Sequence, residues 1–199
     1  MTRAYSLFAL ALIALIAGAA AATPARPEGF GSNPRALEAW LAFEEDQPIR
    51  ARELAERLLA DDPASFAAHC LLARSLRRSE GDPAPALRHA QQCRALFEAR
   101  HGAEPPADTP WYWHRFALYE LYAGSEELER HADSLRYLDA LERYYPGRVD
   151  AFRGWPLLSL GRLAEGRAAA RRALELEFNA VQVAKAWTVL CALEARAER

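Results

Sequence analysis

Cysteine is scarce in this chain, with three residues among 199, at Cys70, Cys93 and Cys191. Three irregularly spaced cysteines are too few for the disulfide framework that holds small secreted domains together. The formal net charge is only −2, so the chain has no bulk positive charge to attract nucleic acid. No segment alternates apolar and polar residues over a useful length, which argues against a β-sheet.

Catalytic motifs are missing as well. The chain has no G-x-S-x-G elbow, no glycine-rich phosphate loop and no H-E-x-x-H pair. The acidic clusters at 44–46 and 126–127 fall at predicted turns and helix ends, where carboxylates complement helix dipoles or face water. We therefore expect neither an enzyme nor a bound cofactor.

Apolar residues are abundant: 51% of the chain is hydrophobic and 10% is aromatic, which is enough for a core in a chain of one-domain length. The first 22 residues have the layout of a secretory signal peptide, with Arg3, an apolar run over 7–16 and small residues over 17–22. Cleavage after Ala22 would give a periplasmic or secreted protein. If uncleaved, the segment would instead anchor the chain, since it is nearly long enough to span a membrane.

Residues 23–33 are rich in proline and glycine and predict a flexible lead-in, so the folded domain is expected over 34–199. Within it, apolar residues recur at three- and four-residue steps, which predicts successive helices. Residues 100–110 predict a loop, and Gly124 and Gly161 predict turns. The predicted helices span 34–45, 48–60, 65–79, 83–99, 111–123, 126–145, 148–160, 163–177 and 180–199.

The helix predicted over 163–177 shows the pattern best. Leu163, Gly166, Ala170, Ala173 and Leu174 share one face, which is made largely of small residues, so another helix can approach closely. A helical pair of this kind cannot cover its own apolar side and needs a similar neighbour. The first eight helices form four such pairs, and the last stands alone.

On these residues the chain resembles the tetratricopeptide repeat (TPR) family, whose unit is about 34 residues long. The matching residues are His69, Leu72, Ala73, Leu76, Ala86 and Pro63 in one unit, Trp113, Phe116, Ala117, Leu138 and Pro146 in the next, and Gly154, Gly161, Gly166, Ala173 and Phe178 in a third. Three features depart from the family: the loop around Pro105 and Pro106 is an insertion, Pro156 falls inside a first helix, and Phe178 stands where proline is usual. An internal proline costs about 3 kcal/mol unless the helix bends or begins there.

The resemblance implies an all-α superhelix of about four helical hairpins with a C-terminal capping helix. It also implies a concave surface lined by first helices, which is the usual binding face for extended partners. The residues that map to this groove are Arg74, Arg77, Arg78, Trp111, His114, Tyr122, Trp155 and Lys185. Arginines beside aromatic rings suit a peptide with an acidic side chain or a free carboxylate.

The alternative is that the three arginines form a solvated face and that Trp111 and Trp113 fill the gap left by the insertion. Adjacent aromatic residues on a helix cannot all point the same way. We expect Trp113 in the core, with Trp111 and His114 exposed in the groove.

His69 and Cys70 lie on one predicted helix, and His89 and Cys93 lie one turn apart on the next. Two imidazoles and two thiolates could bind a metal, but this spacing is not a known metal motif, and we expect no metal site. Export would permit a Cys70–Cys93 disulfide. The favoured interpretation is that these are unbridged core groups.

We expect an exported, TPR-like adaptor or scaffold of a bacterial-type cell envelope that binds a protein or peptide, and not nucleic acid. One alternative is a structural subunit of an envelope complex that docks through its convex face and end helix, with no peptide groove. A more distant one is an accessory domain of an envelope enzyme that acts on cell-wall material.

Overall fold

The computed structural model describes residues 34–79, 82–103, 112–175 and 180–197. Over these residues it contains helices and turns but no strand, as the absence of alternating segments predicts. The helices are α2 (Pro34–Glu44), α3 (Pro48–Asp61), α4 (Phe66–Ser79), α5 (Pro83–His101), α6 (Tyr112–Glu127), α7 (His131–Glu142), α8 (Asp150–Ser159), α9 (Leu163–Glu175) and α10 (Ala180–Ala197). The predicted signal peptide and lead-in lie outside the described residues.

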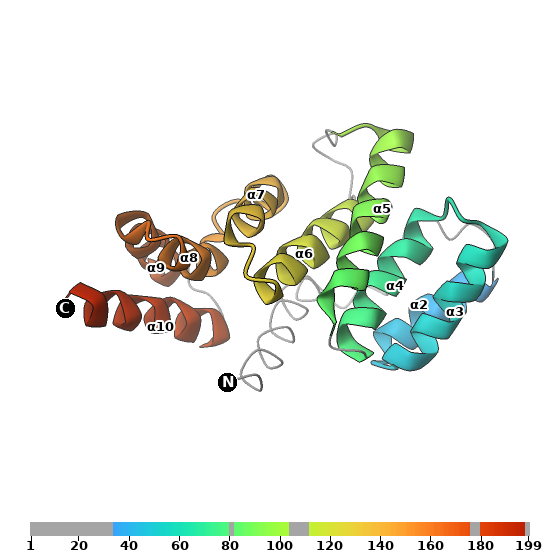
Figure 1. Cartoon of the computed structure of the whole chain (residues 1–199), viewed down its shortest axis with the longest axis horizontal. Helices are drawn as coiled ribbons and strands as arrows, with labels where there is room; N and C mark the ends of the chain where they lie inside the picture. The colour runs from blue at the N-terminus through green and yellow to red at the C-terminus, as the bar shows by residue number, and fades with distance from the viewer. Residues whose placement is uncertain (1–33, 80–81, 104–111, 176–179, 198–199) are drawn as a thin grey trace. The chain divides into compact units, whose positions relative to one another are not determined.

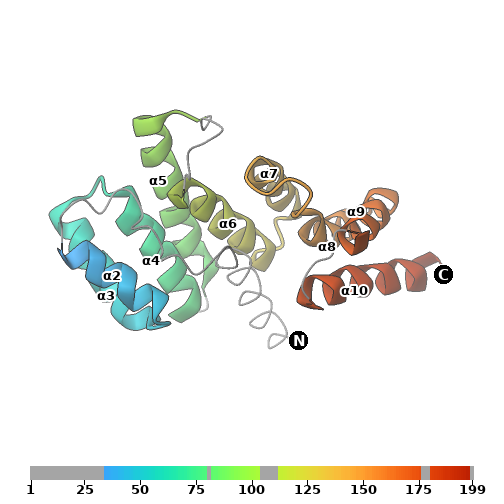
Figure 2. The same ribbon diagram turned by 180° about the vertical axis from the view of Figure 1, so that it is seen from behind.

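The described helices fall into two compact units, which are here called the N-terminal unit (α2–α7) and the C-terminal unit (α8–α10). Within the N-terminal unit each helix packs against the next in the chain, and the first helices of the hairpins, α2, α4 and α6, also pack in sequence (Figures 1 and 2). In the C-terminal unit α8 packs against α9, and α10 packs against both. This pattern is typical of stacked helical hairpins.

Turn chemistry explains two of the helix boundaries. Asp82 accepts a hydrogen bond from the amide of Ala84 at 2.9 Å and precedes Pro83, a combination that favours the start of α5. Gly161 has a φ of +73° between α8 and α9, where the left-handed conformation favours glycine. The turn predicted there is confirmed.

One predicted turn is wrong. Helix α6 continues through Gly124 to Glu127, and the chain turns at Glu129, whose φ is +56°. Gly124 is buried, and a Cβ there would lie 3.2 Å from Cδ1 of Leu87 on α5. The glycine therefore permits close helix packing and does not end the helix.

The core of the N-terminal unit centres on α4, where ten consecutive or nearly consecutive side chains from Phe66 to Leu76 are buried. Helix α9 buries Gly166, Ala170 and Ala173 as predicted, but Leu163 at its start is exposed. Pro156 is accommodated inside α8. No helix among the described residues is both long enough and apolar enough to cross a membrane.

Candidate functional site

The arginines predicted to line a groove belong to an ion-pair network between α4 and α6, called here the Arg–Glu network. Nη1 of Arg74 lies 2.7 Å from Oε1 of Glu120, and Nε of Arg77 lies 2.8 Å from Oε2 of the same carboxylate. Arg77 also contacts Glu127, with Nη1 and Oε1 2.9 Å apart. The Arg74 side chain is 2% exposed and that of Glu120 is 1% exposed. Two guanidinium groups thus share one buried carboxylate.

Within the Arg–Glu network, the neighbouring charges favour the charged forms of Glu120 and Arg77. Burial pushes the pKa of Glu120 upward, but Arg77 and Arg74 together outweigh burial and hold this pKa below its ordinary value. The carboxylate in turn raises the pKa of Arg77 despite burial. At the edge of the network, burial raises the pKa of Glu127 more than Arg77 lowers it.

Aromatic rings surround the guanidinium of Arg74. Its central carbon lies 5.7 Å from the ring centroid of Phe43 on α2, 5.9 Å from that of Phe116 and 5.7 Å from that of Tyr119. These distances allow cation–π attraction, which strengthens when water is excluded. None of these three rings was among the predicted groove residues, and together they enclose Arg74.

The predicted exposure of Arg74 and Arg77 is therefore wrong, both as an open groove and as a solvated face. A buried arginine is retained because a matching carboxylate neutralises it, and Glu120 has that role here. Arg78 is partly exposed and pairs with Asp46 at 2.5 Å between Nη1 and Oδ1. Of the three arginine side chains, that of Arg78 is the most exposed, at 25%.

His114 is also buried, contrary to its predicted exposure. It is 2% exposed and links two neighbours, with Nδ1 2.6 Å from the Tyr144 hydroxyl and Nε2 2.9 Å from Oε1 of Glu98. Because the ionised Glu98 carboxylate can only accept, Nε2 carries the proton and Nδ1 accepts from Tyr144. Burial lowers the pKa of His114 although Glu98 opposes the shift. This histidine joins α5, α6 and the segment after α7.

The other residues with predicted positions differ in how far they are buried. Trp113 is buried in the core, as predicted. Tyr122 is partly buried, and burial raises its pKa well above the ordinary value. Trp155 is 42% exposed on α8. Trp111 and the side chain of Lys185 lie outside the described part of the chain, so their predicted roles stay predictions.

Cys70 and Cys93 form a disulfide between α4 and α5, so the favoured unbridged interpretation is wrong. Their Cα atoms are 5.3 Å apart, a distance that a bridge requires. Cys191 on α10 is an exposed, free thiol. Among the described residues no group of three or more histidine, cysteine or acidic side chains is placed to hold a metal.

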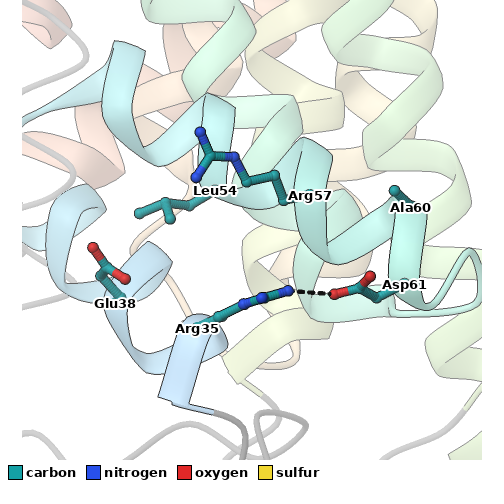
Figure 3. Close-up of a pocket in the computed structure, with 6 residues that line it drawn as sticks. All are labelled: Arg35, Glu38, Leu54, Arg57, Ala60 and Asp61. Carbon is teal, nitrogen blue, oxygen red and sulfur yellow. Dashed lines mark hydrogen bonds and ion pairs between the residues drawn. The ribbon is translucent and has the colours of Figure 1, made fainter.

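A pocket that the sequence did not predict lies between α2 and α3 (Figure 3). Its lining residues are Arg35, Glu38, Leu54, Arg57, Ala60 and Asp61. Nη1 of Arg35 pairs with Oδ2 of Asp61 at 2.9 Å across the pocket, and Glu38 pairs with Arg50 at 2.8 Å. Side chains of both charge signs line it.

Among the described residues, large exposed apolar side chains are more numerous in the C-terminal unit, and they include Leu163, which periodicity had placed on an apolar helix face. Trp187 on α10 is 56% exposed, and Leu160 and Leu163 flank the turn between α8 and α9. The three-helix C-terminal unit therefore has two exposed tryptophans, Trp155 and Trp187. In the N-terminal unit the large apolar residues exposed among the described positions are Leu41 and Ile49.

No family model matches the chain, and no curated protein sequence matches it. Among solved structures the chain is similar to MamA, a TPR-containing protein, in the form "MamA RS-1 ArsTM double mutant". The two share 13% sequence identity and a TM-score of 0.58, over 83% of this chain and 97% of the MamA chain. At this identity the similarity concerns the fold, and it confirms the predicted class: this chain has an all-α, TPR-like fold.

Proposed function

We propose that this chain is a non-enzymatic, helical-repeat scaffold that binds a protein partner through exposed apolar side chains of its C-terminal unit. The observation that carries the proposal is a contrast in exposure. Arg74 and Arg77 are neutralised in the protein interior, whereas Trp155 and Trp187 are exposed. Stacked helical hairpins are commonly used to hold partners.

Tryptophan supports this location because it is among the residues that contribute most to protein interfaces. A large ring buries much apolar area while losing little side-chain entropy. The proposal therefore moves the binding surface from an arginine groove towards the end helix, α10.

Export to the cell envelope remains part of the proposal. Two features support it: the signal-peptide layout of residues 1–22 and the Cys70–Cys93 disulfide, since disulfides persist mainly in oxidising compartments. Cell fractionation with mass measurement of the purified chain tests this part. A chain that begins at Thr23 in an envelope fraction supports it, whereas a chain with residues 1–22 in the cytosol contradicts it.

Comparative capture from envelope extract tests the binding surface. The full chain, Trp155→Ala and Trp187→Ala are immobilised at equal density, and a partner recovered by the unchanged chain is quantified for each variant. A hot-spot tryptophan costs about 2 kcal/mol or more when truncated, so affinity should fall by about 30-fold or more for at least one variant.

Ile49→Ala is the matched control because Ile49 is exposed, apolar and in the N-terminal unit. It should leave capture unchanged, and far-ultraviolet circular dichroism should be the same for all variants. If Ile49→Ala lowers capture while both tryptophan variants bind normally, the proposed surface is wrong.

A further inference from the structure

His69 on α4 and His89 on α5 form a hydrogen-bonded pair, called here the histidine pair. Their Nδ1 atoms are 2.9 Å apart, and their ring centroids are 5.1 Å apart. Both side chains are half-buried. His69 also uses Nε2, which lies 3.2 Å from the backbone oxygen of Pro63 in the connection between α3 and α4.

These contacts fix where the protons are. The Pro63 oxygen can only accept, so Nε2 of His69 must donate. In the neutral ring Nδ1 of His69 is then the acceptor, and Nδ1 of His89 donates to it. The neutral pair therefore leaves Nε2 of His89 as its one free site for a proton.

We propose that the histidine pair is a pH-sensitive joint that holds α4 and α5 together with at most one positive charge and breaks when a second proton binds. The first proton enters at Nε2 of His89 and leaves both hydrogen bonds intact. The second must enter at Nδ1 of His69, where it places a donor against the Nδ1–H of His89. The inter-ring hydrogen bond is then lost, and two like charges face each other.

The charged groups around the pair do not relieve this repulsion. On α3, Glu56 favours protonation of His89, but Glu56 is exposed and already pairs with Arg52 at 2.8 Å. On α5, Arg88 opposes protonation of His89. Burial is the main cause that lowers the pKa of both histidines, and the mutual influence of the two rings adds to it at His89.

The neighbouring disulfide keeps the strain local. Cys70 follows His69 directly, and Cys93 lies one turn after His89, so the bridge holds the two helix backbones together beside the pair. The helices cannot separate to relieve the charge, and the rings themselves must turn apart. Acid should therefore destabilise the N-terminal unit at this joint while the Cys70–Cys93 bridge stays intact.

Urea unfolding of the oxidised full chain between pH 4.5 and 7.5, in buffers with EDTA so that no metal bridges the rings, tests the joint. In the unfolded chain both imidazoles take protons near pH 6.5, whereas the closed pair takes at most one. Below about pH 5.5, this pair alone should therefore raise the unfolding equilibrium constant by about tenfold or more for each unit by which the pH falls.

The double variant His69→Gln with His89→Gln should lose this part of the pH dependence, since two amides can hydrogen-bond at any pH. His131→Gln is the control because His131 lies on α7 and contacts Glu126. It should keep the dependence of the unchanged chain. Equal pH dependence in the unchanged chain and the double variant would overturn the proposal.

Imidazole nitrogen NMR on the unchanged chain gives a second measurement that needs no variant. At neutral pH, His69 should be protonated at Nε2 and His89 at Nδ1, and on acidification the two rings should titrate in separate steps. Protonation of Nδ1 on His69 at neutral pH, or one common titration near pH 6.5, contradicts the proposal.

Discussion

At the scale of single residues, Glu120 neutralises two arginines, Arg74 and Arg77, inside the N-terminal unit. Its two oxygens face Arg74 and Arg77 separately, and its side chain is 1% exposed. A buried pair of this kind adds little stability compared with apolar packing, but the loss of one partner leaves an uncompensated charge. The network therefore adds little to the stability of the fold, but removing one of its members should cost much stability.

We expect Glu120→Gln to lower the free energy of unfolding by about 3–5 kcal/mol, because both guanidinium groups lose their buried counter-charge. Urea denaturation at pH 7 measures this change. Glu165→Gln is the control, since Glu165 pairs with Arg162 in an exposed ion pair with oxygen and nitrogen 2.6 Å apart. It should cost much less than Glu120→Gln, because solvent screens an exposed ion pair. Similar losses for the two variants would contradict the buried role of Glu120.

The pH dependence of this contribution has a definite sign. Arg77 and Arg74 lower the pKa of Glu120 in the folded protein relative to its ordinary value of 4.5. The stabilisation is therefore fully present above the pKa of the unfolded carboxyl and is lost as the pH falls through the lowered, folded value. The Glu120→Gln variant should lack this acid-dependent loss.

Sequence periodicity could not predict these residues. It assigns arginine and histidine to the solvent side of a helix, which is correct for most of them. The exceptions depend on partners far away in the chain: Glu120 is 46 residues from Arg74, and Tyr144 is 30 residues from His114. The aromatic neighbours of Arg74 were not predicted either, since Phe43, Phe116 and Tyr119 are not among the predicted groove residues.

At the scale of elements, helix positions were predictable and the covalent link between two helices was not. Most helix bounds agree with the periodic pattern within a few residues, because capping residues, prolines and apolar spacing are local signals. The bridge between Cys70 and Cys93 depends on how α4 and α5 lie against each other. No local signal encodes that distance.

We expect the chain as purified to contain one titratable thiol under denaturing conditions, at Cys191, and three after reduction. The double variant Cys70→Ala with Cys93→Ala should lose about 3 kcal/mol of stability, since the bridge closes a loop of 23 residues. Thiol titration and urea denaturation measure the two effects. Three free thiols before reduction would exclude the bridge.

Helix packing in the C-terminal unit gives a separate prediction. A Cβ at Gly154 on α8 would lie 3.0 Å from both methyl carbons of Val189 on α10. Gly154→Ala should therefore lower the free energy of unfolding by about 1–3 kcal/mol through overpacking. Adding Val189→Ala should restore part of that loss by making room, which distinguishes a steric cause from a change in helix propensity.

Gly166→Ala is the matched control in the same unit. A Cβ at Gly166 would meet its neighbours at 3.4 Å or more, which is ordinary contact. Because alanine also favours helix more than glycine does, this variant should be neutral or stabilising by up to about 1 kcal/mol. Thermal unfolding followed by circular dichroism compares all three variants. Equal losses for Gly154→Ala and Gly166→Ala would argue against close packing at Gly154 in particular.

At the scale of the whole molecule, the two units differ in how they place their tryptophans. In the N-terminal unit Trp40 and Trp113 are buried, whereas in the C-terminal unit Trp155 and Trp187 are exposed. The resemblance to the TPR family predicted Trp155 in an exposed groove, and Trp113 was predicted in the core. It did not predict the open face of α10, since an end helix is expected to be polar on its outer side.

Acrylamide quenching of tryptophan fluorescence should detect this difference. In a Trp111→Phe background, the folded chain should show an easily quenched component from Trp155 and Trp187 and a protected one from Trp40 and Trp113. Replacing both exposed tryptophans with phenylalanine should remove the first component and leave the second. If quenching does not change, the C-terminal tryptophans are already covered in the free protein, and they cannot provide the apolar surface that the proposed partner requires.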